Sequence, residues 1–289
     1  MDICFVAAGP ITWASSRLRC YWPAKYMNAS VVSFASLHND GLPTADIFIW
    51  QKYVDLGVVR QLAGAQHWWD LSEPVWWFDP EHSREIVQMM KGVVVSNEAL
   101  AEEFTRWNGR SCHIIPDRVE PGYFNRQRVH TAVTPVRLLW FGAVINRVAL
   151  TAAWPNLARL NAAGYNIELT IMDDHPDMPL RFGHNIRVYH VFWAWEREVE
   201  ILASHDIALL PPVPGPWGSM RSNAKELAAW ACRLPVTDGA DYEELRRLVS
   251  SPKERNRLGQ KGHEEVVTQW AVGQSAAEWL ALLLEKTLS

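Results

Sequence analysis

The sequence predicts an α/β fold of two doubly wound domains, each built on a parallel sheet with helices on both faces. The first half of the chain alternates short apolar runs with amphipathic stretches, and the second half repeats this pattern. Such nearly continuous apolar runs are typical of strands buried on both faces of a parallel sheet. A polar stretch near residues 128–135 separates the halves, which predicts domains at 1–130 and 131–289.

Each half contains the apolar runs of a sheet. In the first half they lie at 3–8, 30–36, 46–52, 65–71 and 92–96. In the second half they lie at 136–142, 166–174, 186–192, 206–212 and 234–239. The chain is expected to end in an amphipathic helix over 276–286, because large apolar residues recur there on one face. These residues are Trp279, Leu280, Leu283 and Leu284.

Composition argues for a water-soluble globular protein. The chain has 289 residues, of which 48% are hydrophobic and 21% charged, and a formal net charge of -4. Such a chain has no broad cationic field for nucleic acid or anionic membranes, so nucleic acid is not the default partner. The four cysteines lie too far apart in sequence for a metal or disulfide framework, so we expect reduced thiols.

The first residues and the lengths of the apolar runs bear on where in the cell the protein is expected. The start, MDICFVAAGP, resembles a buried strand and lacks the basic region of a signal peptide. No run has the length of a transmembrane helix, so we expect a cytoplasmic protein without stable membrane insertion. Most of the sixteen tryptophans should be core or domain-interface residues, although pairs such as Trp76-Trp77 near a cleft could also stack on a flat ligand.

Ligands of doubly wound sheets bind at the carboxyl ends of the strands, so polar residues there are the candidates for a site. After the first strand, Ser15, Ser16, Arg17 and Arg19 open a predicted helix. Backbone N–H groups and a guanidinium at this point could hold an anion or a hydroxylated acceptor. An ordinary helix start with solvated arginines explains the residues equally well.

A second candidate group is formed by His67, Asp70 and Glu73 in AQHWWDLSEP. An imidazole and a carboxylate at the tip of a buried strand could orient a hydroxyl nucleophile or stabilise developing positive charge. The alternative is a turn in which Asp70 or Ser72 acts as a cap. For Asp70 we favour the functional interpretation.

The segment DDHPDMP, residues 173–179, offers oxygen ligands for a metal. Its spacing resembles the DxD motif of metal-dependent glycosyltransferases. However, it follows a strand of the second half, and its two prolines indicate a turn rich in aspartate. We therefore favour a loop and expect no metal site.

The last candidate is the segment RSNAKELAAWACRLPV, residues 221–236. Asn223 and Glu226 have the spacing of a capping box. A Gly/Pro-rich loop leads into this helix, whose free N–H groups and positive dipole end could hold a diphosphate together with Arg221 and Lys225. A capped surface helix would explain Asn223 and Glu226 but not the long loop.

In their order and spacing, these segments resemble the GT-B glycosyltransferases, specifically the group 1 / family 4 retaining type. The resemblance rests on residues 92–124, which end in IPDRVE and a later phenylalanine, on VRLLWFG at 136–142, on DIALLPP, and on AWACRLPVTDGADYEEL. RSNAK resembles the run of basic and small polar residues found in shorter relatives. Nearly the whole chain is covered.

The resemblance implies two Rossmann-like domains that face a central cleft, with the C-terminal helix packing back toward the N-terminal domain. It implies transfer of a hexosyl or pentosyl group from a nucleotide-sugar donor, expected to carry UDP or GDP, to the hydroxyl of a glycan or another acceptor. Retention of configuration and independence of metal and cofactor are also implied, since basic residues and a helix N-terminus neutralise the leaving diphosphate.

Carried onto this sequence, the resemblance together with the candidates above gives three sets of site residues. The donor set is Gly142, Asn146, Arg147, Arg221, Ser222, Asn223 and Lys225. The catalytic set is His67, Asp70 and Lys225. The acceptor set is Ser16, Arg17 and Glu73.

The sequence also departs from the family pattern. Ala143 stands where the family has an arginine, Ala228 where it has a ribose-binding glutamate, and Arg233 where it has a glycine. Glu226 cannot replace that glutamate, because two positions along a helix correspond to a rotation of roughly 200°. Two alternatives therefore stay open: a degenerate GT-B protein that binds a glycan or a partner without catalysis, and the same chemistry on a hydroxylated nucleobase in DNA.

Overall fold

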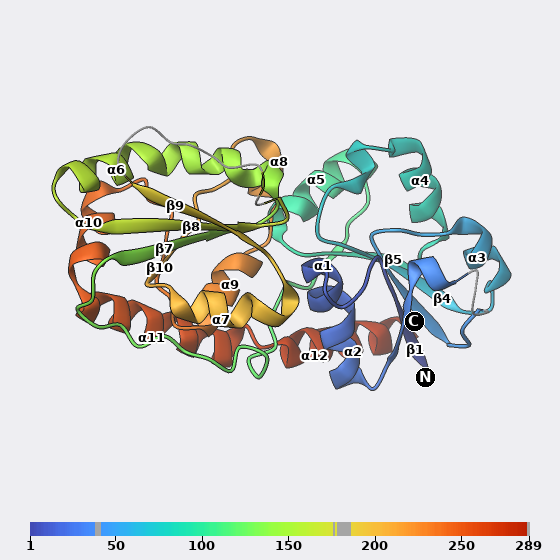
Figure 1. Cartoon of the computed structure of the whole chain (residues 1–289). Coiled ribbons are helices and arrows are strands. Elements are labelled where there is room, and N and C mark those ends of the chain that lie inside the picture. Colours follow the sequence, from blue (N-terminus) through green and yellow to red (C-terminus); the bar gives the residue numbers. More distant parts are fainter. Residues whose placement is uncertain (38–41, 176, 178–185, 288–289) are drawn as a thin grey trace. The chain divides into compact units, whose positions relative to one another are not determined.

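A computed structural model describes residues 1–37, 42–175, 177 and 186–287. Its contacts divide the chain into two compact units (Figure 1). The first comprises Met1–Glu120, Met220–Ser222 and Ala271–Ser289, and the second comprises Pro121–Ser219 and Asn223–Trp270. Compared with the predicted domains, residues 121–130 therefore lie in the second unit and residues 271–289 in the first.

The first unit contains a parallel sheet of six strands in the order β2-β1-β3-β4-β5-β6. Its strands are β1 (Ile3–Ala7), β2 (Ser30–Ser33), β3 (Ile47–Gln51), β4 (Gln66–Leu71), β5 (Gly92–Val95) and β6 (His113–Ile114). Its helices are α1 (Ala14–Ser16), which continues through a π-helical stretch at Arg17–Tyr21 into α2 (Trp22–Met27), then α3 (Leu56–Gln61), α4 (Pro80–Met89), α5 (Glu98–Asn108) and α12 (Val272–Thr287).

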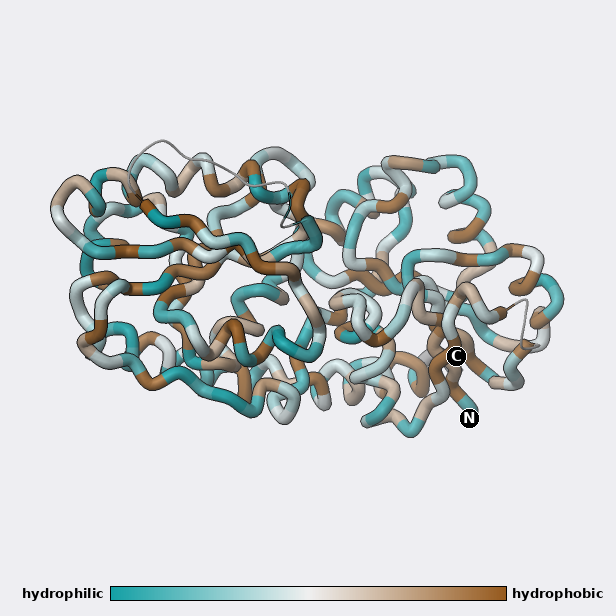
Figure 2. The backbone as a smooth tube through the Cα atoms, in the orientation of Figure 1, coloured by the Kyte–Doolittle hydropathy of each residue, from teal (hydrophilic) through white to brown (hydrophobic). Residues whose placement is uncertain are grey.

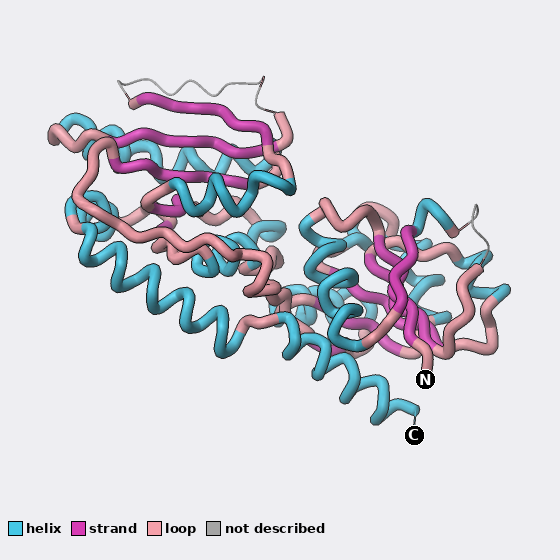
Figure 3. The backbone as a smooth tube through the Cα atoms, turned by 60° about the horizontal axis from the view of Figure 1, so that its bottom comes forward, coloured by secondary structure: helices cyan, strands magenta, loops and turns pink. Residues whose placement is uncertain are grey.

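The alternation of side chains along these strands builds a core on each face of the sheet. On one face, Val6, Trp50 and Trp69 pack with residues of α3, α4 and α5. On the other face, Phe5 and Trp68 pack with residues of α2 and α12. Figure 2 shows the apolar character of these strands, and Figure 3 shows the helices that flank them. The expected return of the C-terminal helix to the N-terminal domain is confirmed.

The second unit contains a parallel sheet of five strands in the order β11-β10-β7-β8-β9. Its strands are β7 (Val136–Phe141), β8 (Ile167–Asp173), β9 (Arg187–Phe192), β10 (Ile207–Leu209) and β11 (Val236–Thr237). Its helices are α6 (Leu150–Ala162), α7 (Glu198–Ser204), α8 (Pro216–Ser219), α9 (Ala224–Ala231), α10 (Tyr242–Ser250) and α11 (Pro252–Gln269). Residues of α6 and α10 pack on one face of the sheet, and Figure 1 shows α7, α9 and α11 toward the other.

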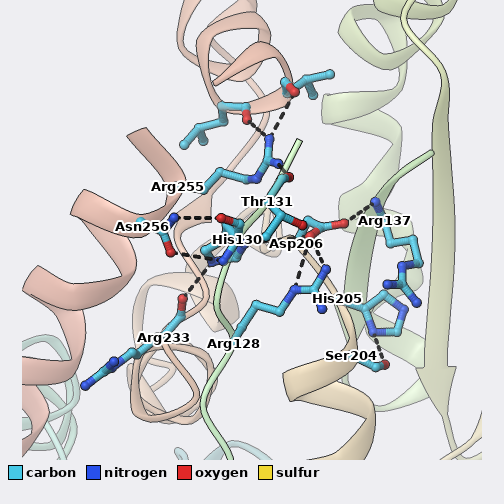
Figure 4. Close-up of polar contacts among 12 residues, drawn as sticks. Arg128, His130, Thr131, Arg137, Ser204, His205, Asp206, Arg233, Arg255 and Asn256 are labelled. Carbon is cyan, nitrogen blue, oxygen red and sulfur yellow. Dashed lines mark hydrogen bonds and ion pairs between the residues drawn. The ribbon is translucent and has the colours of Figure 1, made fainter. Parts of the chain in front are cut away.

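The polar stretch predicted as a linker is anchored to the second unit (Figure 4). Arg128 donates to the buried carboxylate of Asp206 at 2.7 Å. His130 exchanges backbone hydrogen bonds with the side chain of Asn256, and its Nε2 lies 3.0 Å from the carbonyl oxygen of Arg233. The boundary predicted near 128–135 therefore falls inside the second unit, because these polar residues bind its helices.

Candidate functional site

The chain order of the second sheet defines a switch point between β7 and β10. From β7 the chain builds β8 and β9 on one side and then returns to add β10 on the other. The crevice at the carboxyl ends of two such strands is where doubly wound sheets bind their ligands. Gly142 follows β7 at this point, and the loop that leads to α9 follows β10.

Lys225 and Gly142 come together at this switch point. A Cβ atom added to Gly142 would lie 3.0 Å from Lys225 Nζ, and Gly142 has a φ of 151°, so a side chain at this position would be both strained and crowded. The Lys225 ammonium also lies 5.5 Å from the ring centroid of Trp140 on β7. The Lys225 ammonium thus lies beside the backbone of Gly142, where no side chain intervenes.

The start of α9 differs from the predicted capping box. Asn223 does occupy the N-cap position, but its side chain makes no capping hydrogen bond. The expected use of Asn223 and Glu226 as reciprocal caps is therefore wrong. Burial raises the pKa of Glu226, with the helix N–H and Lys225 opposing the rise. The side-chain amide of Asn223 is not committed to closing the helix end.

Asn146 and Arg147 follow Gly142 in a 3-10 helix at Val144–Ala149. Arg147 is buried and pairs through two nitrogens with Asp173 at the end of β8, and it donates to the His175 carbonyl at 2.5 Å. The Arg147 charge is therefore neutralised by Asp173 inside the second unit. Asn146 is also buried, and within the described part of the chain its Nδ2 makes no hydrogen bond.

The aspartate-rich segment after β8 behaves as a loop where it is described. Asp173 binds Arg147, and Asp174 accepts a hydrogen bond from the Val144 backbone N–H at 2.8 Å. The described residues contain no group of three or more side chains that could hold a metal ion. Residues 176, 178 and 179 of this segment lie outside the described residues.

In the first unit, Asp70 is enclosed by Arg19. The Asp70 carboxylate is fully buried and accepts two hydrogen bonds from the Arg19 guanidinium, one of them at 2.9 Å. The same guanidinium reaches Asp117 at 3.0 Å and the Ile115 carbonyl at 2.6 Å. Burial raises the pKa of Asp70, while Arg19 opposes this rise. Arg19 therefore binds both oxygens of the Asp70 carboxylate, which is not accessible to a substrate.

His67 does not join Asp70. It is the second residue of β4, at the amino end, and residues three apart on a strand face opposite sides. Its Nδ1 accepts from Trp50 Nε1 at 3.0 Å and its Nε2 lies 3.1 Å from the Leu62 carbonyl. Burial lowers the pKa of His67. The expected cluster at the strand tip is therefore wrong, and His67 is a neutral core residue.

Ser16 and Arg17 are buried behind the end of β1. Ser16 Oγ accepts from the Gly9 N–H at 3.1 Å and donates to Gln51 Oε1 at 3.0 Å, and Gln51 also accepts from the Ala8 N–H at 2.9 Å. Arg17 donates to the Thr12 carbonyl at 3.0 Å. The N–H groups of Ala8 and Gly9, in the turn before the predicted helix, are thus already occupied. Gln51 was not predicted, since nothing local in the sequence shows that its amide caps the turn after another strand.

The other predicted residues lie in the first unit. Glu73 is partly exposed and forms an ion pair with Lys52, which follows β3. Arg221 and Ser222 belong to a short segment whose first residue, Met220, is buried. The Met220 carbonyl accepts from Asn97 Nδ2 at 2.9 Å. Of the predicted donor residues, the structure thus brings Gly142 and Lys225 together, with Asn146 nearby in sequence.

Comparisons with known proteins bear on the fold. No protein-family model matches the sequence, and no curated protein is significantly similar to it. A glycosyltransferase from Rickettsia africae has a similar structure, with a TM-score of 0.67 and 10% identity over 99% of this chain and 98% of that one. The chain has the GT-B fold.

Two further GT-B structures resemble the chain. The catalytic domain of starch synthase IV from Arabidopsis thaliana, solved with ADP and acarbose, gives a TM-score of 0.59 at 10% identity, over 88% of this chain and 75% of that one. The α,α-trehalose 6-phosphate synthase of Burkholderia multivorans gives 0.56 at 12% identity, over 84% and 70%. In this GT-B chain, no described helix combines the length and apolarity needed to cross a membrane.

Proposed function

We propose that this GT-B chain is a glycosyltransferase that takes a sugar from a nucleotide diphosphate donor and transfers it to an acceptor hydroxyl. The observation that carries the proposal is Lys225 Nζ above the bare backbone of Gly142 at the switch point of the second sheet. A diphosphate fits there, because the backbone can approach closely at a glycine and an ammonium neutralises the negative charge.

Two more features of the second unit support this role. Among the described residues, no hydrogen-bond partner meets the buried Nδ2 of Asn146, which lies just after Gly142 in the sequence. The N-terminus of α9 adds its dipole. As a diphosphate leaves the sugar, Lys225 would stabilise the charge that develops on it. We propose no metal, since Lys225 and the helix N-terminus would supply the positive charge. Arg147 does not contribute, because Asp173 holds it.

We further propose that transfer retains the anomeric configuration. Asp70 and His67 are enclosed by Arg19 and by Trp50 with Leu62, so neither presents a nucleophile. A front-face mechanism needs none, because the departing phosphate itself takes the proton of the acceptor hydroxyl. Acceptor binding would fall to the first unit.

Calorimetry with UDP, GDP, ADP, TDP and CMP tests the donor site. We expect one nucleoside diphosphate to bind and Lys225→Ala to weaken that binding by about tenfold to a hundredfold, the value of a charge-assisted hydrogen bond. Lys225→Arg should retain part of the affinity. Gly142→Ala should weaken binding, because a φ of 151° strains an alanine and the new Cβ displaces the Lys225 ammonium. Lys261→Ala is the matched control, since it removes an exposed lysine of α11. Equal binding by wild type and Lys225→Ala would refute the site.

A second candidate function is glycan binding without catalysis. It is favoured by Ala228, which is buried in α9 where family members carry a ribose-binding glutamate. Such a protein would bind an oligosaccharide yet release no nucleoside diphosphate from any nucleotide sugar. Turnover that Lys225→Ala abolishes would exclude it.

A further inference from the structure

The first sheet has a switch point of its own, between β1 and β3. From β1 the chain adds β2 on one side and then β3 on the other, so the carboxyl ends of β1 and β3 frame the place where a ligand is expected. None of the residues proposed for the donor lies here. The chemistry at this edge must therefore be considered separately.

This switch point does not suit an anion. The backbone N–H groups of Ala8 and Gly9 donate to Gln51 and Ser16, so they cannot hold a phosphate. Arg19 is neutralised by two aspartates in the interior. Lys52, just after β3, is paired with Glu73. Arg17 donates to the Thr12 carbonyl, so each of these charged side chains is engaged within the unit.

Exposed aromatic rings flank the same switch point. Trp13, in the turn after β1, is 52% exposed, and Tyr53, after β3, is 44% exposed. The Trp13 ring lies against Gly9, where an added Cβ would come within 2.4 Å of Trp13 Cε3. Tyr53 packs beside Phe34 with ring centroids 5.8 Å apart, and Lys52 Nζ lies 5.3 Å from the Tyr53 centroid. Neighbouring structure thus supports each ring and leaves it accessible.

Two further exposed aromatics of the first unit, Trp77 and Phe78, follow β4 and are 41% and 76% exposed. A tryptophan exposed to half its area, such as Trp13, is uncommon in a soluble protein, and exposed aromatics that flank a switch point indicate a binding surface.

We propose that Trp13 and Tyr53 form an acceptor platform for a neutral oligosaccharide. The C–H face of a sugar ring is apolar and stacks on aromatic rings, while Lys52 and Glu73 offer a donor and acceptors for its hydroxyls. A neutral ligand is favoured over a phosphate or an anionic lipid headgroup, because the Ala8 and Gly9 N–H groups are occupied, Lys52 is paired with Glu73 and Arg17 is bound to backbone carbonyls. The inference rests on the proposed transferase activity and names the class of its acceptor.

The test uses the full chain on an array of neutral and acidic oligosaccharides, followed by calorimetry with the best neutral binder. We expect neutral glycans to bind, and Trp13→Ala and Tyr53→Ala each to weaken binding by about tenfold. Trp13→Phe keeps a ring and should stay within about threefold of wild type. Phe192→Ala is the matched control, since it removes an exposed aromatic of β9 in the second unit.

Thermal melting checks that the variants fold, and Trp13→Phe and Tyr53→Ala keep the test valid should Trp13→Ala not fold. Binding of acidic glycans only, of no glycan, or equally by all variants would overturn the platform. So would binding to phosphatidylglycerol vesicles that Tyr53→Ala abolishes while glycan binding is unchanged. Binding of UDP or GDP by the same preparations distinguishes failure of the platform from failure of the proposed function. If only the platform fails, wild type and Trp13→Ala should still bind the nucleotide equally.

Discussion

Asp70 is a fully buried carboxylate that Arg19 neutralises in the interior of the first unit. Its place at the end of a buried strand was predicted correctly. Its partner Arg19 lies 51 positions earlier in the chain, and only the parallel packing of β4 beside β3 and β1 brings the two together. The sequence shows where a carboxylate lies but not which cation neutralises it.

Replacing Asp70 should therefore unfold the protein more readily. Asp70→Asn leaves the Arg19 charge buried with only Asp117 and the Ile115 carbonyl as partners, and the loss of one member of a buried pair costs about 3–5 kcal/mol. Urea unfolding measures this cost. Glu73→Gln, at the partly exposed pair with Lys52, should cost less than about 1 kcal/mol. An Asp70→Asn protein as stable as wild type but inactive in transfer would restore the catalytic role to Asp70.

Asp206 should make the second unit sensitive to acid. Burial raises the pKa of this carboxyl, but the neighbouring His130, the Arg137 backbone N–H and Arg128 outweigh burial and hold it well below its usual range. A depressed pKa contributes stability above the unfolded value of about 3.9, and that stability is lost as the pH falls below it.

His205 adds an earlier and separate loss, because burial lowers the pKa of His205 and its stabilising effect falls away below about pH 6.5. Urea unfolding of Asp206→Asn as a function of pH should thus show the decline below about pH 6.5 but lack the steeper one below about pH 4. Parallel curves for wild type and variant would contradict the role of Asp206.

At the scale of the element, helix α9 ends in a Schellman motif at an unusual residue. The Leu234 N–H donates to the Ala229 carbonyl and the Arg233 N–H to the Trp230 carbonyl, both at 2.9 Å. The motif requires a left-handed residue at the position of Arg233, whose φ is 60°. A left-handed conformation favours glycine, so arginine at this position is strained.

Arg233→Gly should accordingly stabilise the protein, by up to about 1 kcal/mol, because strain in the left-handed region costs about 1–3 kcal/mol and the greater freedom of unfolded glycine offsets part of it. Gly259→Ala is the opposite test, because a Cβ on Gly259 would lie 2.1 Å from the Arg233 carbonyl oxygen. It should destabilise by about 1–3 kcal/mol. Chemical denaturation of both variants checks these signs.

Strands were the elements that the sequence predicted best. All the predicted runs form strands. The central strands are buried on both faces and so are nearly continuous apolar segments, whereas the edge strands β2 and β9 are partly exposed. The additional strand β6 has only two residues and follows a polar turn, too short for any periodicity. The start of α9 was placed correctly, but its capping bonds were not, since spacing alone cannot show whether the Asn223 side chain turns toward its own helix.

For the whole molecule, both sheets are parallel and doubly wound, but their strand orders and the chemistry of their switch points differ. The second presents Lys225 above Gly142, and the first presents Trp13 and Tyr53 around N–H groups that are already occupied. An anionic donor and a neutral acceptor would suit these two points. The parallel, doubly wound sheets and the positions of Gly142 and Lys225 could be predicted from sequence, whereas the strand orders could not. The hydrogen bonds that occupy the first switch point involve Gln51 and Arg19, whose partners are distant in the chain.

The central claim is that the chain transfers sugars from a nucleotide diphosphate. The most direct test is release of the nucleoside diphosphate from a panel of UDP-, GDP-, ADP- and TDP-sugars, with EDTA present and without an added acceptor. Slow hydrolysis of one donor, unchanged by EDTA and lost in Lys225→Ala, is the predicted result. Release from no donor, or release that Lys225→Ala leaves unchanged, would contradict the account.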